Sequence, residues 1–115
     1  MNPFLASIEN ANTVSGAWRK VFSTEQGYRR GCEIRAWSSN GNNIFVTMVP
    51  KGTPSASYPA IPDPTTASAA ERNVRKVIYA GDSLRLDADG GQNVDILVIA
   101  ADTTSILYYT ATELI

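Results

Sequence analysis

Between residues 13 and 112, the sequence consists of short runs rich in Val, Ile, Thr, Tyr and Trp, separated by turn residues at short intervals. Apolar and polar side chains alternate in most of these runs, as they do in a strand that buries one face. The expected strands lie, in chain order, at 13–22, 32–37, 44–49, 75–80, 83–87, 94–101 and 105–112. About seven short strands with turns between them predict an all-β domain, either a small antiparallel β-sandwich or a barrel-like jelly roll.

Two parts of this pattern are more specific. The runs 32–37 and 44–49 flank the loop SSNGNN, whose Asn40-Gly41 dipeptide is typical of the tight turn of a β-hairpin. We therefore expect the two runs to pair as a hairpin. The run VDILVIAA at 94–101 is almost continuously apolar, which is typical of a strand covered on both faces.

The segment 50–70 interrupts the strand pattern. Five of the six prolines lie between Pro50 and Pro64, mixed with Ala, Ser and Thr. Because proline has no N–H for a strand ladder and favours extended backbone before it, this segment predicts a long irregular loop. A loop of this length in a small domain usually has a use. Three uses stay open: an extended arm that lies on a neighbouring subunit, a mobile surface loop, or a lid over a small ligand.

Residues 1–12 are polar, and we expect either a frayed terminus or an N-terminal arm that docks elsewhere, with Phe4 and Leu5 among its apolar contacts. Since 115 residues is an ordinary size for one domain, the chain 1–115 is expected to form a single β domain.

The composition excludes several chemistries. Because there is no His, Ser-His-Asp triads, Cys–His pairs and His-bound zinc are impossible. The single Cys excludes an internal disulfide and a cysteine-cluster metal site. We therefore expect no catalytic residue, no metal and no cofactor, and the chain is not expected to be an enzyme or to have a small-molecule substrate.

The charge and hydropathy limit the partners. A net charge of −1 disfavours a nucleic-acid partner. The longest apolar run, 96–101, is too short to cross a bilayer, which takes about 20 helical residues, so no membrane partner is expected. The N-terminal residues do not have the pattern of a secretory signal, so synthesis in the cytoplasm is expected.

The low charge suggests assembly. Charged residues make up only 18% of the chain, against about 25% on average. Six apolar residues are expected to face outward beyond what one small core absorbs: Phe45, Val49, Leu97, Ile99, Leu107 and Tyr109. An isolated monomer seldom exposes so much apolar surface, so we expect an interface with copies of the chain or with a larger particle. The candidate interface residues are Phe4, Leu5, Tyr58, Ile61, Pro62, Trp37 and Tyr109.

The aromatic residues permit a second hypothesis. Trp18, Trp37, Tyr108 and Tyr109 together are candidates for a sugar-stacking face, as in carbohydrate-binding sandwiches. Aromatic residues in strands more often belong to a core or an interface.

A family resemblance extends over residues 43–115. The motif Gly81-Asp82-Ser83-Leu84 is followed by the apolar run 94–101, by the turn Asp102-Thr103-Thr104 and by the final strand 105–112. This order resembles small β-sandwich virion proteins of tailed bacteriophages, such as capsid decoration (cement) proteins and components of the head–tail junction or tail. The resemblance implies an oligomeric, non-enzymatic protein. The proline-rich insertion at 50–64 departs from the shortest of these proteins and leaves the subtype open.

These observations lead to one functional expectation and two alternatives. The chain is expected to be a structural virion protein of a tailed phage, made in the host cytoplasm, that binds and stabilises the capsid shell through β-surfaces and extended arms. Its partners would be copies of itself and the major capsid protein or connector proteins. The alternatives are a head–tail connector or tail ring subunit, and a carbohydrate- or host-surface-binding β-sandwich module.

Overall fold

The computed structural model describes residues 7–22, 31–62, 74, 76–86 and 94–114. These residues contain eight strands: β1 (Ser7–Asn12), β2 (Arg19–Lys20), β3 (Gly31–Ala36), β4 (Ile44–Pro50), β5 (Lys76–Ile78), β6 (Ser83–Leu86), β7 (Val94–Ala100) and β8 (Tyr108–Leu114). One short 3₁₀ helix, η1 (Ser55–Ser57), lies between β4 and β5. Every segment expected to be a strand contains one, although the segment 13–22 keeps only the two residues of β2.

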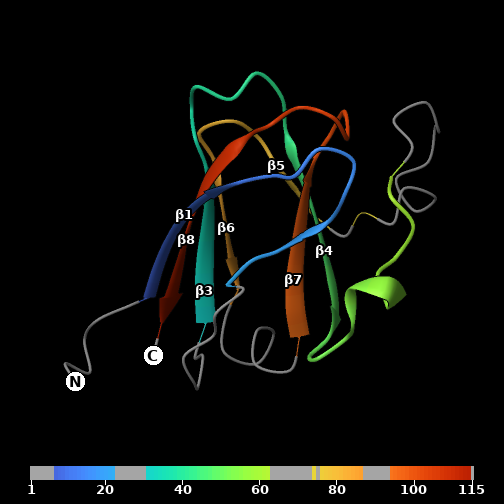
Figure 1. Ribbon diagram of the computed structural model, residues 1–115. Coiled ribbons are helices and arrows are strands. Elements are labelled where there is room, and N and C mark those ends of the chain that lie inside the picture. The colour runs from blue at the N-terminus through green and yellow to red at the C-terminus, as the bar shows by residue number, and fades with distance from the viewer. Residues whose placement is uncertain (1–6, 23–30, 63–73, 75, 87–93, 115) are drawn as a thin grey trace.

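The strands form two four-stranded antiparallel sheets that face each other (Figure 1). The first sheet has the order β1-β8-β3-β6, and the second has the order β2-β7-β4-β5. The pairing is nested, because β1 pairs with β8, β2 with β7, β3 with β6 and β4 with β5. Each of the strands β1 to β4 thus has an antiparallel partner among β5 to β8, taken in reverse order. The prediction of an all-β antiparallel fold is confirmed, and the two separate sheets are consistent with the expected β-sandwich and do not form a closed barrel.

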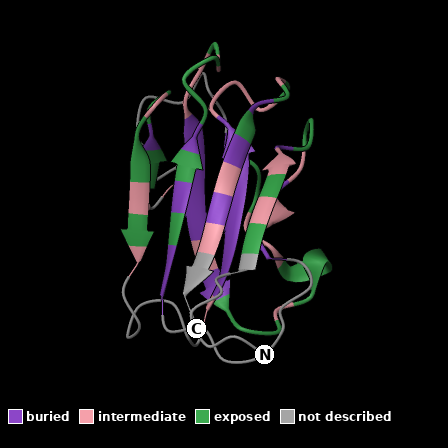
Figure 2. Ribbon diagram, turned by 90° about the vertical axis from the view of Figure 1, so that its left-hand side faces the viewer, coloured by how far each residue is buried: buried purple, intermediate pink, exposed green. Residues whose placement is uncertain are grey.

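The main hydrophobic core fills the space between the sheets. In β4 and β7 of the second sheet, the even-numbered apolar side chains point into this core; in β8 of the first sheet, the odd-numbered ones do. The largest fully buried members are Tyr109, Ile34, Ile44, Ile78, Ile96, Val21, Val46 and Val98. Figure 2 views the first sheet from outside: buried positions alternate with exposed or intermediate ones along β3 and β8, and intermediate positions alternate with exposed ones along β6. This period-2 burial is what the alternating sequence runs predicted.

A second hydrophobic cluster lies on the outer face of the second sheet. It contains Trp18, Phe45, Val49, Leu97 and Ile99, each exposed by 7% or less. Tyr58, Val74 and Ala101 pack against it. Strand β7 is therefore covered on both of its faces, as its apolar run predicted.

This second cluster corrects the expectation of an apolar surplus on the outside. Four of the six residues concerned, Phe45, Val49, Leu97 and Ile99, do face away from the main core, but this chain itself covers them. The other two, Leu107 and Tyr109, lie in the main core. The surplus that predicted an obligate interface is thus absorbed within one chain.

The proline-rich segment supplies part of this cover through Tyr58. Residues 51–62 contain no strand and run through a turn and η1. The Trp18 indole Nε1–H donates to the Pro59 carbonyl oxygen at 3.1 Å, and the Pro62 side chain is buried. Within the described residues, the segment therefore packs on the second sheet of its own chain, and an arm that reaches a neighbouring subunit stays a prediction. Residues 63–70 of the predicted loop lie outside the described chain.

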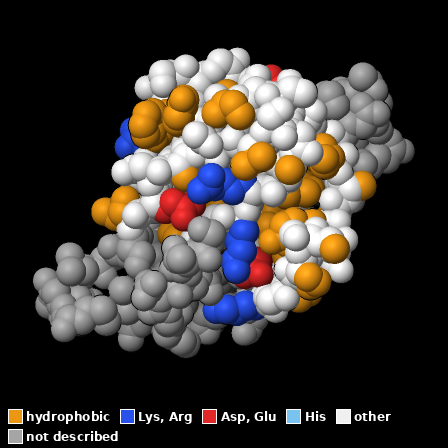
Figure 3. Space-filling model, viewed as in Figure 1, with side chains coloured by type: hydrophobic (Ala, Val, Ile, Leu, Met, Phe, Trp, Pro, Cys, Tyr) orange, Lys and Arg blue, Asp and Glu red, His pale blue; other side chains and the backbone are white. Residues whose placement is uncertain are grey.

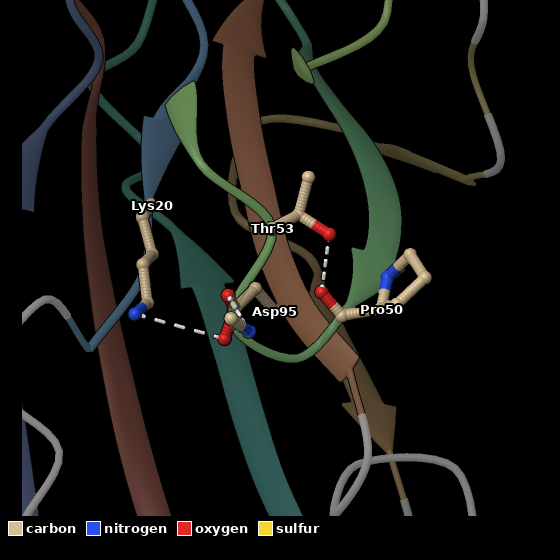
Figure 4. Close-up of polar contacts among 5 residues, drawn as sticks. Lys20, Pro50, Thr53 and Asp95 are labelled. Atoms are coloured by element: carbon tan, nitrogen blue, oxygen red, sulfur yellow. Dashed lines mark hydrogen bonds and ion pairs between the residues drawn. The ribbon is translucent and has the colours of Figure 1, made fainter. Parts of the chain in front are cut away.

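A buried carboxylate fixes the start of this segment (Figure 4). Asp95 on β7 has a side chain that is only 1% exposed, and its Oδ1 lies 3.7 Å from the Lys20 ammonium nitrogen. Its Oδ2 accepts the Gly52 backbone N–H at 3.0 Å. Gly52 has a φ of +85°, a left-handed conformation that glycine adopts without steric cost. Asp95 thus holds the turn that sends the chain back over the second sheet.

The predicted hairpin at 32–49 is wrong in its pairing. β3 belongs to the first sheet and β4 to the second, so the loop between them crosses from one layer to the other. Neither Asn40 nor Gly41 has a positive φ, so the dipeptide does not form the expected hairpin turn. The reason is that each strand finds its neighbours elsewhere: β3 lies between β8 and β6, and β4 lies between β7 and β5.

The N-terminal segment differs as well. Ser7–Asn12, expected to belong to an arm or a frayed terminus, form β1 at the edge of the first sheet, in register with β8. Residues 1–6, with Phe4 and Leu5, lie outside the described chain.

The polar turn before β8 is present as expected. Asp102 accepts the backbone N–H groups of Thr104 and Ser105, at 3.1 and 2.9 Å, and also the Ser105 hydroxyl. These hydrogen bonds, that of the hydroxyl above all, hold the pKa of Asp102 below its usual value. The turn thereby sets the direction in which β8 enters the first sheet.

Candidate functional site

The outer face of the first sheet carries an exposed aromatic pair in polar surroundings. The register places Asn10 opposite Thr110, and Thr110 opposite Arg35, so these side chains form one row across β1, β8 and β3. In the neighbouring row, Asn12 lies opposite Tyr108. Trp37 continues this row, because its backbone N–H donates to the Tyr108 carbonyl oxygen at 3.2 Å.

The Trp37 and Tyr108 rings are stacked on each other. Their centroids are 5.3 Å apart, and the ring planes meet at 27°. The two residues are 40% and 45% exposed. The offset stacking of two aromatic rings stabilises their arrangement by about 0.5–1.5 kcal/mol. The pair therefore presents fixed aromatic surface to solvent.

Hydrogen bonds hold both aromatic residues in place. The Trp37 Nε1–H donates to the Thr110 hydroxyl oxygen at 2.9 Å, and that hydroxyl donates to the Asn10 Oδ1 at 2.7 Å. The Asn40 side chain bonds the Tyr108 backbone twice: its Nδ2 donates to the carbonyl oxygen at 2.8 Å, and its Oδ1 accepts the N–H at 2.9 Å. The Asn40 side-chain amide thus bonds the Tyr108 backbone as a neighbouring strand would. Asn40 does not form the hairpin turn expected from the sequence.

Two open hollows flank the aromatic pair. One has a volume of about 220 Å³ and is lined by Asn10, Ala11, Asn12, Trp37 and Tyr108. The other, of about 410 Å³, is lined by Arg35, Trp37, Ser38, Ser39 and Thr110. Both contain amide or hydroxyl groups beside an aromatic ring, which is the usual composition of a site that fixes the orientation of a small polar ligand.

The residues expected at an interface are distributed over several places. Trp37 is at the site just described, and Ile61 is 45% exposed on the proline-rich segment. Tyr58 is half-buried against the second cluster, and Pro62 is buried. Tyr109 is fully buried, and its inclusion is corrected: it shares a face with Ala111 and points into the main core.

The candidate sugar-stacking residues separate in the same way. Trp37 and Tyr108 lie together at the surface, whereas Trp18 is in the second cluster and Tyr109 in the main core. The sequence contained the signal for part of this division, because Tyr108 and Tyr109 are adjacent in a strand and must face opposite sides. Sequence reasoning missed Asn10 and Asn40, whose contacts with the aromatic pair depend on the fold.

A seam of polar side chains separates the two sheets at the β1 edge. The Tyr109 hydroxyl donates to the Glu9 Oε1 at 2.9 Å. Burial first, and then the Glu9 carboxylate, raise the pKa of Tyr109 well above its ordinary value. Figure 3 shows Lys, Arg, Asp and Glu side chains down the middle of this view, with hydrophobic groups on either side. An inward-pointing charge such as Glu9 also protects an edge strand from pairing with another chain.

A second candidate surface lies on the opposite side of the sandwich. We call residues 52–62 the proline ridge; their sequence, GTPSASYPAIP, contains no charged residue. A hollow of about 230 Å³ lies between the ridge and Trp18 of the second cluster. It is lined by Ala17, Trp18, Ser55, Tyr58, Pro59 and Ile61. Val77 of β5, 38% exposed, lies opposite Phe45 and so on the same face of the second sheet.

Other site classes find no support in the described part of the chain. No group of three or more His, Cys, Asp or Glu side chains is arranged there to hold a metal ion. Among the same residues, no helix has the length and apolar composition needed to cross a membrane. Comparisons with protein-family models, with curated proteins and with solved structures find no match to this chain.

Proposed function

We propose that this protein is a structural protein of a tailed-phage virion that attaches to the capsid shell, as a decoration protein, through the proline ridge. Its partners are the major capsid protein and copies of the chain itself. The chain has no catalytic role in this proposal. A head–tail connector or tail ring subunit is the alternative, and copy number separates the two.

The architecture supports this class of function. The nested pairing of eight antiparallel strands in two sheets matches a jelly roll, an architecture used in viral capsid and lectin domains. Because one fold serves many functions, the choice among them depends on the surfaces.

The proline ridge is the single observation on which the proposal depends. Protein interfaces are depleted of charged residues at their centre, and the ridge has none over its eleven residues from Gly52 to Pro62. Ile61 exposes 45% of its surface there, and Val77 adds apolar surface on the same face. An uncharged and exposed ridge that presents apolar side chains such as Ile61 is a surface that a protein shell would cover.

The ridge is also ordered before any partner arrives. Trp18 holds it through the Pro59 carbonyl, Asp95 holds its start through Gly52, and the buried Pro62 fixes its end. Its three prolines, Pro54, Pro59 and Pro62, also restrict its backbone. A segment that is already fixed loses less conformational entropy on binding than a free arm does, so the ridge suits attachment better than the arm expected from the sequence.

The test is co-assembly with particles. The chain is produced together with the capsid and connector proteins of its own genome, and the particles are purified on a density gradient. We expect the chain to band with the particles and Ile61→Asp to lower its occupancy at least about tenfold, which corresponds to ~1.4 kcal/mol of binding free energy. Ile106→Asp is the matched control, because Ile106 is 48% exposed but lies in the β7–β8 connection, and its occupancy should equal that of wild type.

The outcomes are distinguishable. A copy number that scales with the major capsid protein supports decoration, whereas a single ring of copies per particle supports the connector alternative. Light scattering of wild type and Ile61→Asp tests whether the ridge also joins copies of the chain. Absence of the chain from all particles would overturn the proposal, and so would full occupancy of Ile61→Asp when its thermal unfolding matches wild type.

A further inference from the structure

We infer that the outer face of the first sheet around Trp37 and Tyr108 is a binding site for an acidic oligosaccharide. The proline ridge packs against the outer face of the second sheet, on the other side of the sandwich. The inference therefore stands on its own observations and holds whether or not the chain attaches to a particle.

The aromatic pair supplies the stacking surface. The C–H groups of a sugar ring pack on the face of an aromatic ring, and Trp and Tyr combine apolar area with a polar group. Trp37 and Tyr108 are stacked, 40% and 45% exposed, and held by hydrogen bonds to Thr110 and Asn40. Since the rings are already fixed, ordering them costs little when a ligand binds.

The two flanking hollows supply hydrogen-bonding groups on both sides of the pair. Asn10 and Asn12 line one, and Arg35, Ser38 and Ser39 line the other. Their volumes, about 220 and 410 Å³, bracket the lower end of ligand pockets, which hold about 300–1,000 Å³. Because Trp37 lines both, a ligand of several sugar units can occupy one hollow, cross the aromatic pair and enter the other.

Arg35 determines the charge of the ligand. The neighbouring Glu33 lies opposite Arg85 in the β3–β6 register, so two opposite charges face each other there. Arg35, in contrast, lies opposite Ser83 on one side and Thr110 on the other, and both are neutral. Among the described residues it makes no ion pair. A guanidinium group binds a carboxylate with two parallel hydrogen bonds, so its charge is complementary to a sugar acid.

The test uses the intact protein and defined saccharides. Oligogalacturonate and sialyllactose are the carboxylated probes, a sulfated oligosaccharide is the second anionic probe, and cello- and malto-oligosaccharides are the neutral probes. Titration calorimetry should detect binding of a carboxylated probe and weaker binding of the neutral ones. Trp37→Ala and Tyr108→Ala should each weaken binding at least about tenfold, and Arg35→Gln should remove the preference for the carboxylated probe.

Matched controls separate the site from general surface effects. Tyr79→Ala removes a tyrosine that is 59% exposed but lines neither hollow, and Arg85→Gln removes the same charge from the same face of the sheet. Both should leave the affinity for the carboxylated probe within about twofold of wild type.

A spectroscopic measurement on unmodified protein keeps the inference testable if a variant fails to fold. The chain has only two tryptophans, so its spectrum contains two indole N–H signals. On titration with the carboxylated probe, the Trp37 signal should shift and that of the buried Trp18 should stay. Three results would each overturn the inference: no saccharide binding at millimolar concentration, shifts that leave Trp37 unchanged, or affinities that Arg35→Gln does not alter.

Discussion

Replacing Trp18 tests whether the chain covers its own second sheet. Trp18 is 7% exposed, packs with Phe45, Val49, Leu97 and Ile99, and binds the Pro59 carbonyl oxygen. Truncating a buried Trp or Phe to Ala usually costs about 3–5 kcal/mol. We expect Trp18→Ala to lower the free energy of unfolding by this amount, because the indole joins the outer face of the sheet to the proline ridge.

Two further variants divide this effect into its parts. Trp18→Phe keeps most of the apolar contact and loses the hydrogen bond to Pro59, so its expected cost is about 1 kcal/mol. It also keeps the test open if Trp18→Ala does not fold. Trp37→Ala is the matched control: Trp37 is 40% exposed and lies on the other sheet, and its loss should cost about 1 kcal/mol.

The assay is urea unfolding followed by circular dichroism at 25 °C, with the free energy extrapolated to zero denaturant. If Trp18→Ala were no more destabilising than Trp37→Ala, the ridge and the indole would not be packed on the second sheet. The argument that the chain absorbs its own apolar surplus would then fail.

Three other perturbations follow from particular contacts. Gly52→Ala should lower the free energy of unfolding by about 1–2 kcal/mol because Gly52 has a φ of +85°. Gly41→Ala should be neutral in the same urea assay because Gly41 has no positive φ and has open space around it. An equal loss for both variants would indicate that Gly41 does adopt the positive φ of the hairpin turn expected from the sequence. Asp95→Ala should lower the free energy of unfolding by about 1–3 kcal/mol because it leaves the Gly52 N–H without its acceptor. Asp95→Asn keeps an acceptor and should cost less. Equal costs for the two variants would contradict the role of that hydrogen bond. Because the pKa of Tyr109 is raised in the folded state, its contribution to stability is complete below about pH 10, the pKa of an exposed tyrosine, and is lost as the pH rises further. Urea midpoints measured from pH 8 upward should therefore fall at high pH for wild type and less steeply for Tyr109→Phe, and parallel curves would refute the assignment.

The strand positions were predictable because their signal is local. Alternation in 32–37 and 105–112 is a property of neighbouring residues, and both segments contain a strand. The pairing was not predictable in the same way. The Asn40-Gly41 dipeptide is typical of a hairpin turn, but β3 pairs with β8 and β6, and β4 pairs with β7 and β5, so β3 and β4 do not pair with each other. Pairing between residues far apart in sequence decided this, and a single sequence does not show it.

The position of the aromatic residues was partly predictable. Tyr108 shares a face with Thr110 and Thr112, and Tyr109 shares one with Ala111, so polarity alone favoured Tyr109 as the buried member. The prediction of Tyr109 at an interface did not use that signal.

The covered second cluster needed the structure. The outward direction of Phe45 and Leu97 followed from alternation. The cover comes from Trp18, Tyr58 and Val74, none of which lies in a strand of either sheet. Proline-rich sequence gave no indication of whether the segment would extend away from the domain or fold back on it. The hydrogen bonds of Trp18 and Asp95 decide that question.

A density map of assembled particles, at a resolution that shows individual strands, tests the central claim most directly. The account predicts the sandwich on the shell with residues 52–62 against the major capsid protein and the outer face of β1-β8-β3-β6 toward solvent. Particles on which the chain is seated with the proline ridge exposed, or particles without the chain, would contradict it.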